Sequence, residues 1–183
     1  YKYYSAGYAC FLSDIGSQKD NWDIWDNSMP INVSDKDIVG YKYFGFGGLA
    51  EAQKGLKPVE GTAPGNGTSF NVFLTPKTEK AFKINVWLDG PWANEAWKGI
   101  KIGEINVPAG SAEVVTKFTI DVADAVDNLD KKHAIYLVAE GEGDLCELMG
   151  LGFSKKGQKM TYPAPPAVTI SVDGKALEMP KHP

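Results

Sequence analysis

The stretch FKINVWLDGPWANEAWKGIKIGEINV, residues Phe82–Val107, contains two runs of alternating apolar and polar residues with a turn between them. The first run, Phe82–Leu88, ends at Asp89-Gly90, a pair with strong turn chemistry. The second run, Ile100–Val107, alternates again. A period of two is typical of strands that bury one face, so this stretch predicts two strands of an antiparallel sheet.

The same alternation recurs along the rest of the chain, with glycine- and proline-containing turns between the runs. It predicts six further strands, at Gly7–Leu12, Ile38–Phe46, Ser69–Leu74, Val114–Val122, Ala134–Ala139 and Leu148–Phe153. Helical periodicity is nearly absent, and only Asp121–Leu129 is compatible with a single helical turn. Short strands with frequent turns indicate an all-β fold, namely an antiparallel β-sandwich.

The composition narrows the classes of ligand. The chain has 183 residues, 43% of them hydrophobic and 23% charged, and its net charge is −4. All 19 basic residues are lysine. Proteins that bind nucleic acid usually present a basic face and use the guanidinium fork of arginine, so we expect no nucleic-acid partner. The apolar runs are shorter than the roughly 20 residues that cross a bilayer, so we also expect no membrane span.

The strand pattern changes after Phe153. Residues Tyr162–Pro166 are rich in proline, which predicts a stiff linker. Val168–Met179 predicts a hairpin that turns at Asp173-Gly174, and such a hairpin is too small to be stable alone. We therefore expect a sandwich over residues 1–160, a linker over 161–167 and the truncated start of a following domain over 168–183.

Five segments resemble, in order and spacing, the strands of a family 6 carbohydrate-binding module. They are DIVGYKYFGFG from Asp37, INVWLDG from Ile84, KIGEINVPAG from Lys101, KKHAIYLVAEG from Lys131 and LCELMGLGFSK from Leu145. The resemblance covers about Tyr8 to Lys156 and extends to the variants attached to family 43 glycoside hydrolases of gut Bacteroidetes. It implies a jelly-roll sandwich of the galactose-binding-domain type.

The resemblance also implies a function. The expected function is that of a non-catalytic accessory domain of an exported polysaccharide-degrading enzyme, located outside the cell, at its surface or in the periplasm. Its partners would be a plant or host polysaccharide or oligosaccharide and neighbouring domains of the same chain, and the module would be a monomer. The alternative is a spacer of the same fold that has lost its sugar site and orients neighbouring catalytic domains.

The chain departs from the family at the usual sugar site. The family has an aromatic residue just before the strand that starts at Asp37, and this chain has none there. The tryptophan loop of the family is replaced by Ala109–Glu113, and the position of the sugar-binding asparagine falls near Glu147. The first strand, around Cys10, lacks the glutamates that hold a structural calcium in the family. We therefore expect no metal and no cofactor, with a structural calcium as the alternative that the expected ligands do not support.

Antiparallel strands alternate in direction, so the connections between them gather at two ends of a sandwich. We call the end where the family binds sugar the near end. It should collect Ser13–Lys36, Thr75–Ala81, Ala109–Glu113 and Gly141–Glu147. The far end should collect Gly47–Thr68, Asp89–Gly99 and Asp124–Lys132.

The candidate carbohydrate-binding residues are Trp22, Trp25 and Glu147 at the near end and Trp92 and Trp97 at the far end. A tryptophan ring stacks on the C–H face of a pyranose, so exposed rings would form the platform. Trp22 and Trp25, which we prefer, replace the missing family aromatics or pin a long loop. Three interpretations of Trp92 and Trp97 stay open: the rings cap the core, they contact a neighbouring domain, or they bind sugar.

The sequence does not favour catalysis. Two pairs of carboxylates, Glu140/Glu147 and Asp23/Asp26, are compatible with glycoside hydrolysis, but such pairs occur in most chains of this composition. No motif of an activated nucleophile or a metal protease is present. His133 lies where the family starts a strand, which indicates a structural role.

The resemblance further implies that the strand near Cys10 lies beside the closing strand near Cys146. Two alternatives stay open for these cysteines, namely a disulfide and two free thiols.

Overall fold

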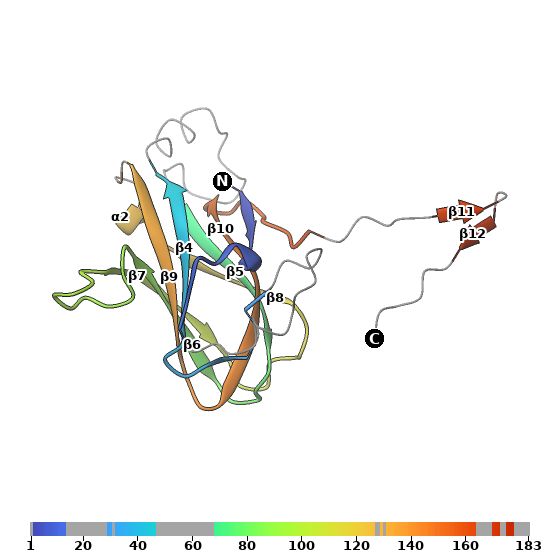
Figure 1. Cartoon of the computed structure of the whole chain (residues 1–183), viewed down its shortest axis with the longest axis horizontal. Coiled ribbons are helices and arrows are strands. Elements are labelled where there is room, and N and C mark those ends of the chain that lie inside the picture. Colours follow the sequence, from blue (N-terminus) through green and yellow to red (C-terminus); the bar gives the residue numbers. More distant parts are fainter. Residues whose placement is uncertain are drawn as a thin grey trace.

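The computed structural model describes residues 2–13, 29–30, 32–46, 68–126, 129, 131–163, 170–172 and 175–177. The described residues up to Lys155 form two sheets of antiparallel strands that pack face to face (Figure 1). Sheet A contains, in order, β1 (Tyr3–Ser5), β10 (Asp144–Lys155), β5 (Thr68–Pro76) and β8 (Thr116–Asp121), and β3 (Val33–Ser34) also pairs with β10. Sheet B contains, in order, β2 (Phe11–Leu12), β4 (Ile38–Gly45), β9 (Lys132–Glu140), β6 (Phe82–Leu88) and β7 (Ile100–Val107). The predicted antiparallel β-sandwich is confirmed.

Two short helical elements and a separate hairpin complete the description. They are η1 (Ala6–Tyr8), α2 (Ala123–Val126) and the antiparallel pair β11 (Ile170–Val172) and β12 (Lys175–Leu177). The hairpin matches the prediction for Val168–Met179, whereas the division of the chain into domains stays a prediction. No helix among the described residues is long and apolar enough to cross a membrane.

The core lies between the two sheets and follows from the alternation of the strands. On β6, Phe82, Ile84, Val86 and Leu88 are at most 3% exposed and belong to the main core. The residues between them, such as Trp87, point to the other side of sheet B, because successive side chains of a strand face opposite sides. We call the side of each sheet that faces away from the other sheet its outer face.

The predicted position of the first strand needs a correction. Residues Gly7–Leu12 do not form one strand, since Ala6–Tyr8 is a 3-10 turn and only Phe11–Leu12 is extended. The turn carries the chain from sheet A to sheet B. β1 pairs with β10 at Gly150–Gly152, whereas β2 pairs with β4. The predicted loop Ser13–Lys36 likewise contains β3, which pairs with β10.

This crossing also corrects the expectation for the cysteines. The strand beside Cys10 lies in sheet B, and Cys146 lies in sheet A, so the two are not on neighbouring strands. Both cysteines are free thiols, Cys10 exposed and Cys146 buried. Burial, with a smaller effect of the Glu147 carboxylate, raises the pKa of the Cys146 thiol to about 12.

The two predicted ends of the sandwich are confirmed for the described connections, whereas most of Gly47–Thr68 and most of Ser13–Lys36 fall outside the described residues. At the near end, the backbone N–H of Lys77 donates to Leu145 O at 2.8 Å, and that of Gly110 donates to Glu79 O at 2.8 Å. At the far end, the backbone N–H of Asp89 donates to Ala134 O at 2.9 Å. Asp89-Gly90 and Thr75–Ala81 therefore lie at opposite ends, joined by β6.

The segment that follows β10 lies on the outer face of sheet A. The ring of Tyr162 is 5.9 Å from that of Phe73 and 6.1 Å from that of Tyr3, measured between centroids. The Lys117 ammonium donates to Met160 O at 3.3 Å. Burial, with a contribution from Tyr162, raises the pKa of Tyr3 to about 12. The segment that follows β10 thus covers part of the outer face of sheet A, next to the edge strand β1.

Gly152 lets these segments approach the sheet. A Cβ at Gly152 would lie 2.3 Å from the backbone oxygen of Lys2 and 3.0 Å from Met160 Cε. We expect Gly152→Ala to lower the free energy of unfolding by about 1–3 kcal/mol, because the backbone at Lys2 must shift. Urea denaturation measures the change. Gly45→Ala is the matched control, since a Cβ there meets no atom within 4 Å. Equal stability of Gly152→Ala and the unaltered chain would contradict this packing.

Candidate functional site

The connection between β6 and β7, residues Asp89–Gly99, is a closed loop. The backbone N–H of Gly99 donates to Trp92 O at 2.8 Å, and that of Lys98 donates to Asn94 O at 2.8 Å. Asn94 Oδ1 also accepts a hydrogen bond from the backbone N–H of Trp97 at 3.0 Å. Gly90 and Gly99 touch at the neck, where a Cβ on Gly99 would lie 2.1 Å from Gly90 O. The loop therefore fixes the positions of its two tryptophans.

These tryptophans belong to a group of four rings on the outer face of sheet B. The Trp97 ring centroid is 6.4 Å from that of Trp92, 6.1 Å from that of Phe11 and 6.0 Å from that of Tyr136. Each pair is edge-to-face, with interplanar angles of 65–74°. We call Phe11, Trp92, Trp97 and Tyr136 the aromatic cluster.

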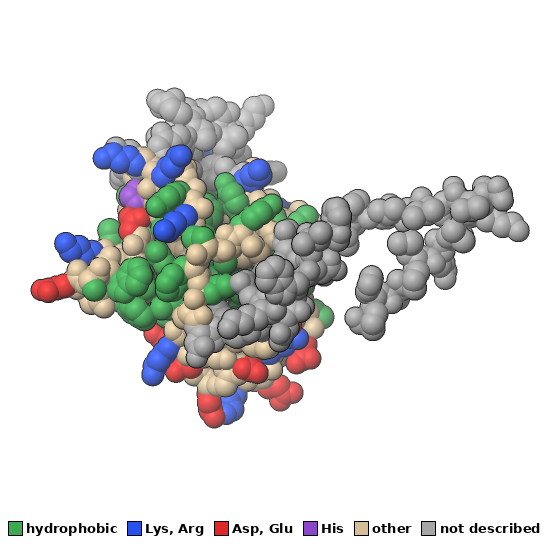
Figure 2. Space-filling view, viewed as in Figure 1, with side chains coloured by type: hydrophobic (Ala, Val, Ile, Leu, Met, Phe, Trp, Pro, Cys, Tyr) green, Lys and Arg blue, Asp and Glu red, His purple; other side chains and the backbone are tan. Residues whose placement is uncertain are grey.

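The cluster is partly open to solvent. Trp92 is 39% exposed and Trp97 36%, whereas Tyr136 beneath them is 6% exposed. Figure 2 shows hydrophobic side chains gathered on this side of the molecule, next to the projecting connection between β6 and β7 that Figure 1 shows at the left. Since neither tryptophan belongs to the main core, the interpretation of these rings as a core cap is wrong.

The aromatic cluster rests on a smaller hydrophobic layer of the sheet. Ile38, Ala134 and Val138 are each at most 5% exposed and pack with Tyr136, Phe11 and Trp87 on the outer face of sheet B. Trp87 is half-buried and packs against this layer from β6. Gly40 leaves room for the Tyr136 ring, because a Cβ there would lie 2.8 Å from Tyr136 Cε1.

The base of the loop is held by Asp89 and His133. Asp89 Oδ2 lies 2.7 Å from His133 Nδ1, and Asp89 Oδ1 accepts the Ala134 N–H at 3.1 Å. The His133 ring also packs on Phe46 at 5.6 Å between centroids. This arrangement is consistent with the predicted structural role of His133. It also ties the loop to β9, the strand that carries Tyr136.

The carboxylates at the near end have partners of their own. Glu147 lies 3.3 Å from the Lys77 ammonium, and Glu142 lies 2.7 Å from that of Lys80. The Ser34 hydroxyl donates to Asp144 at 3.0 Å. The hydrogen bond from Lys80 holds the pKa of Glu142 below its ordinary value. In the described part of the chain no group of three or more His, Cys, Asp or Glu residues is placed to hold a metal ion.

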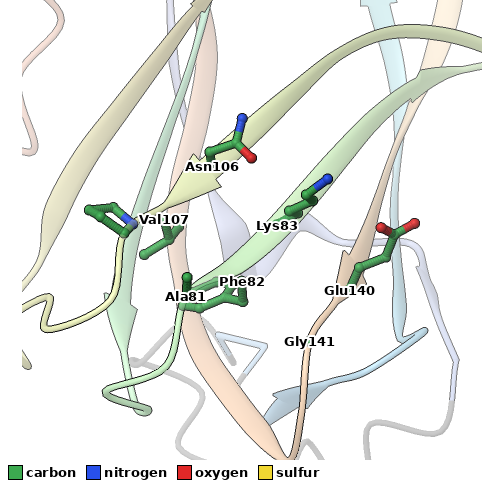
Figure 3. Close-up of a pocket in the computed structure, with 8 residues that line it drawn as sticks. Ala81, Phe82, Lys83, Asn106, Val107, Glu140 and Gly141 are labelled. Carbon is green, nitrogen blue, oxygen red and sulfur yellow. The ribbon is translucent and has the colours of Figure 1, made fainter.

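The outer face of sheet B also has a pocket at the near end, with a volume of about 430 Å³ (Figure 3). Its polar side chains are Lys83, Asn106 and Glu140, one from each of three adjacent strands. The Lys83 ammonium lies 3.1 Å from Glu104, which also pairs with Lys101 at 3.0 Å. Hydrogen bonds from Lys101 and then Lys83 hold the pKa of Glu104 below its ordinary value.

The structure brings together some of the predicted site residues and separates others. The rings of Trp92 and Trp97 lie edge to face, 6.4 Å apart between centroids. Glu147 lies at the opposite end of the sandwich, in sheet A, so it is not part of the same site. Trp22 and Trp25, and the pair Asp23/Asp26, fall outside the described residues, and their roles stay predictions.

Two members of the aromatic cluster were not predicted from the sequence. Phe11 and Tyr136 reach Trp97 from β2 and β9 and are far from it in sequence. For Tyr136 a signal was present. It stands between Ile135 and Leu137, both at most 2% exposed in the main core, so alternation places Tyr136 on the outer face.

Comparison with known proteins adds a likeness of fold. No family model matches the sequence, and neither does any curated protein. A glycoside hydrolase family 43 arabinoxylan arabinofuranohydrolase from Bacillus subtilis, solved with cellotetraose, matches 85% of this chain with a TM-score of 0.52 and 18% identity. The likeness shows the fold. This chain spans 27% of the length of that enzyme.

Two solved carbohydrate-binding modules also match, at lower TM-scores. The module CBM36 in complex with calcium and xylotriose has a TM-score of 0.47 and 11% identity, over 84% of this chain and 100% of that one. The CBM36-1 domain of a multidomain xylanase from the hindgut metagenome of Trinervitermes trinervoides has a TM-score of 0.41 and 12% identity, over 69% and 77% of the two chains.

Proposed function

We propose that this chain is a non-catalytic carbohydrate-binding domain and that the aromatic cluster is its sugar platform. The observation that carries the proposal is the pair Trp92 and Trp97, more than a third exposed and fixed by a closed loop. An exposed indole stacks on the C–H face of a pyranose and removes apolar surface from water. Because the rings are already held in place, little conformational entropy is lost on binding.

The position of the cluster favours a glycan over a neighbouring domain as its partner. β1 is an edge strand of sheet A, and the segment with Met160 and Tyr162 lies on the outer face of the same sheet. The aromatic cluster lies on the outer face of sheet B, on the opposite side of the sandwich. The segment that follows β10 thus lies on the sheet A side of the described sandwich, and the exposed tryptophans lie on the sheet B side.

The finer features of the function are part of the same proposal. We infer that the chain is an accessory domain of an exported enzyme that degrades polysaccharides. This enzyme would be located outside the cell or in the periplasm, and the domain would resemble a family 6 carbohydrate-binding module. The shared fold with part of an arabinoxylan-degrading enzyme makes xylan the first glycan to test. Arabinan and galactan are the next.

The alternative is a spacer without a sugar site. It is favoured by the near end, where the family aromatics are missing and the residues before Asp37 are engaged within the sandwich. The Ser34 hydroxyl bonds Asp144, and Asp35 Oδ1 accepts the Gly141 N–H at 3.1 Å. The near end as described therefore offers no exposed ring in place of the family site.

A panel of soluble polysaccharides separates these two functions. The chain is run on native gels that contain xylan, arabinan or galactan, with serum albumin as a non-binding control. We expect at least one polysaccharide to retard the chain relative to a gel without glycan, because exposed tryptophans bind internal sugar residues of a long chain. Unchanged mobility in every gel would contradict carbohydrate binding and favour the spacer.

A further inference from the structure

The near-end pocket on the outer face of sheet B lies at the ends of three adjacent strands. Its lining comes from Ala81–Lys83 at the start of β6, Asn106–Pro108 at the end of β7 and Glu140-Gly141 at the end of β9. A volume of about 430 Å³ lies within the range of small-molecule sites in proteins. Every residue of this lining belongs to the described part of the chain.

Three polar side chains of different chemistry converge on this pocket. Lys83 is directly opposite Asn106 on one neighbouring strand and Glu140 on the other. Neighbouring strands lie about 4.8 Å apart, so the ammonium, amide and carboxylate form one row across the sheet. Figure 3 shows the three side chains projecting on the same side of strands β6, β7 and β9.

Two of these side chains have no hydrogen-bond or ion-pair partner among the described residues. Lys83 pairs with Glu104, whereas the Asn106 amide and the Glu140 carboxylate make no hydrogen bond or ion pair among the described residues. The carboxylates at the tip of the near end, Glu142 and Glu147, differ in that each has a lysine partner. The row therefore offers free acceptors and donors beside a pocket with apolar walls at Ala81 and Pro108.

We propose that this pocket is a second carbohydrate subsite, which binds a neutral sugar residue through its hydroxyl groups. A sugar hydroxyl can donate to Glu140 or to Asn106 Oδ1 and can accept from the Lys83 ammonium or the Asn106 Nδ2. Hydrogen bonds in which one partner is charged are the stronger ones, which suits an exposed and shallow site. The proposal rests on the proposed carbohydrate-binding function.

The charges of the row select a neutral ligand. Lys83 and Glu140 carry opposite charges, and Glu104 is already balanced by Lys101. An anionic ligand would meet the Glu140 carboxylate, which has no lysine partner among the described residues, and like charges repel. A calcium ion needs six or more oxygen ligands, and the pocket offers only one carboxylate and one amide.

The pocket and the aromatic cluster lie on the same face of the sheet. Lys83 and Trp87 are four residues apart on β6, as are Glu140 and Tyr136 on β9, which is about 13 Å along a strand. An oligosaccharide that is long enough to reach both sites gains from the second contact as an intramolecular one. We therefore expect the subsite to act on longer oligosaccharides.

The test titrates the whole chain with hexasaccharides of xylan, arabinan and galactan. Calorimetry measures the affinity, and NMR shows which residues respond. We expect the double variant Asn106→Ala, Glu140→Gln to bind the preferred hexasaccharide about tenfold more weakly. We also expect the side-chain amide signals of Asn106 to shift during the titration. Glu113→Gln is the matched control, because Glu113 is exposed on the connection between β7 and β8 and does not line the pocket.

The outcomes separate this subsite from the aromatic cluster. If the double variant binds as tightly as the unaltered chain and Asn106 does not respond, while the Trp92 and Trp97 signals do, the subsite is refuted and the proposed function stands. If the unaltered chain binds none of the hexasaccharides and no polysaccharide, both proposals fall. A loss of affinity in the Glu113→Gln control as well would also overturn the subsite, since it would show a general effect of charge.

Discussion

Replacement of Trp97 by alanine is expected to weaken glycan binding by about 30-fold or more. Trp97 is the centre of the aromatic cluster, with Trp92, Phe11 and Tyr136 all within 6.4 Å between ring centroids. Its loss removes one stacking face and the support of another. Removal of such an anchor commonly costs about 2 kcal/mol or more of binding free energy, which corresponds to a roughly 30-fold loss of affinity. Calorimetry with the preferred hexasaccharide measures the change.

A matched control for this variant lies on the opposite face. Tyr162→Ala removes a half-buried ring from the outer face of sheet A, so we expect it to leave glycan affinity unchanged although it lowers stability. Trp97→Ala should retain the fold, because Trp97 lies outside the main core. Affinity within twofold of the unaltered chain in Trp97→Ala would rule out the aromatic cluster as the platform.

Gly99→Ala is expected to reduce binding by about tenfold or more without removing any ring. The new Cβ would lie 2.1 Å from Gly90 O and 2.8 Å from Trp92 O, and both atoms belong to the backbone. Because neither can be displaced by a simple rotamer change, the neck of the loop must open, and overpacking of this kind costs about 1–3 kcal/mol. Trp92 and Trp97 would then lose their relative position.

The measurement for Gly99→Ala is again the affinity for the hexasaccharide, accompanied by the thermal midpoint. Gly45→Ala serves as the control, because it adds a methyl group to a strand of the same sheet without a contact. Full affinity in Gly99→Ala would show that binding does not require the closed loop. In that case the preorganisation of the two tryptophans would have no role.

The sandwich was predictable because most of its strands are long enough to show their period. On β6, four apolar side chains from Phe82 to Leu88 face the core, and Lys83 and Asn85 stand between them. The same alternation assigns Trp87 to the outer face.

The N-terminal pairing was not predictable in the same way. β1 has three residues and β2 has two, so neither shows a period. The turn Ala6–Tyr8 between them is what moves the chain from one sheet to the other. It is defined by a local hydrogen bond from the Gly7 N–H to the Ser5 hydroxyl oxygen at 3.2 Å, which leaves no mark in the apolar pattern.

The candidate site was predictable in its tryptophans and not in its support. Trp92 and Trp97 stand in a segment of small and polar residues, where large rings have little local packing. Their partners Phe11 and Tyr136 come from strands far away in sequence. The roles of Gly90 and Gly99 depend on backbone contacts across the loop. The engagement of Glu147 by Lys77 likewise depends on tertiary structure.

The most direct test of the aromatic cluster is an NMR titration of the five tryptophan indole N–H signals with the preferred hexasaccharide. Each signal is assigned from a Trp→Phe variant. We predict that the signals of Trp92 and Trp97 shift with a common saturation curve. The signal of Trp87, whose Nε1 is buried, should stay in place. Shifts confined to Trp22 and Trp25 would contradict the account and place the site at the near end.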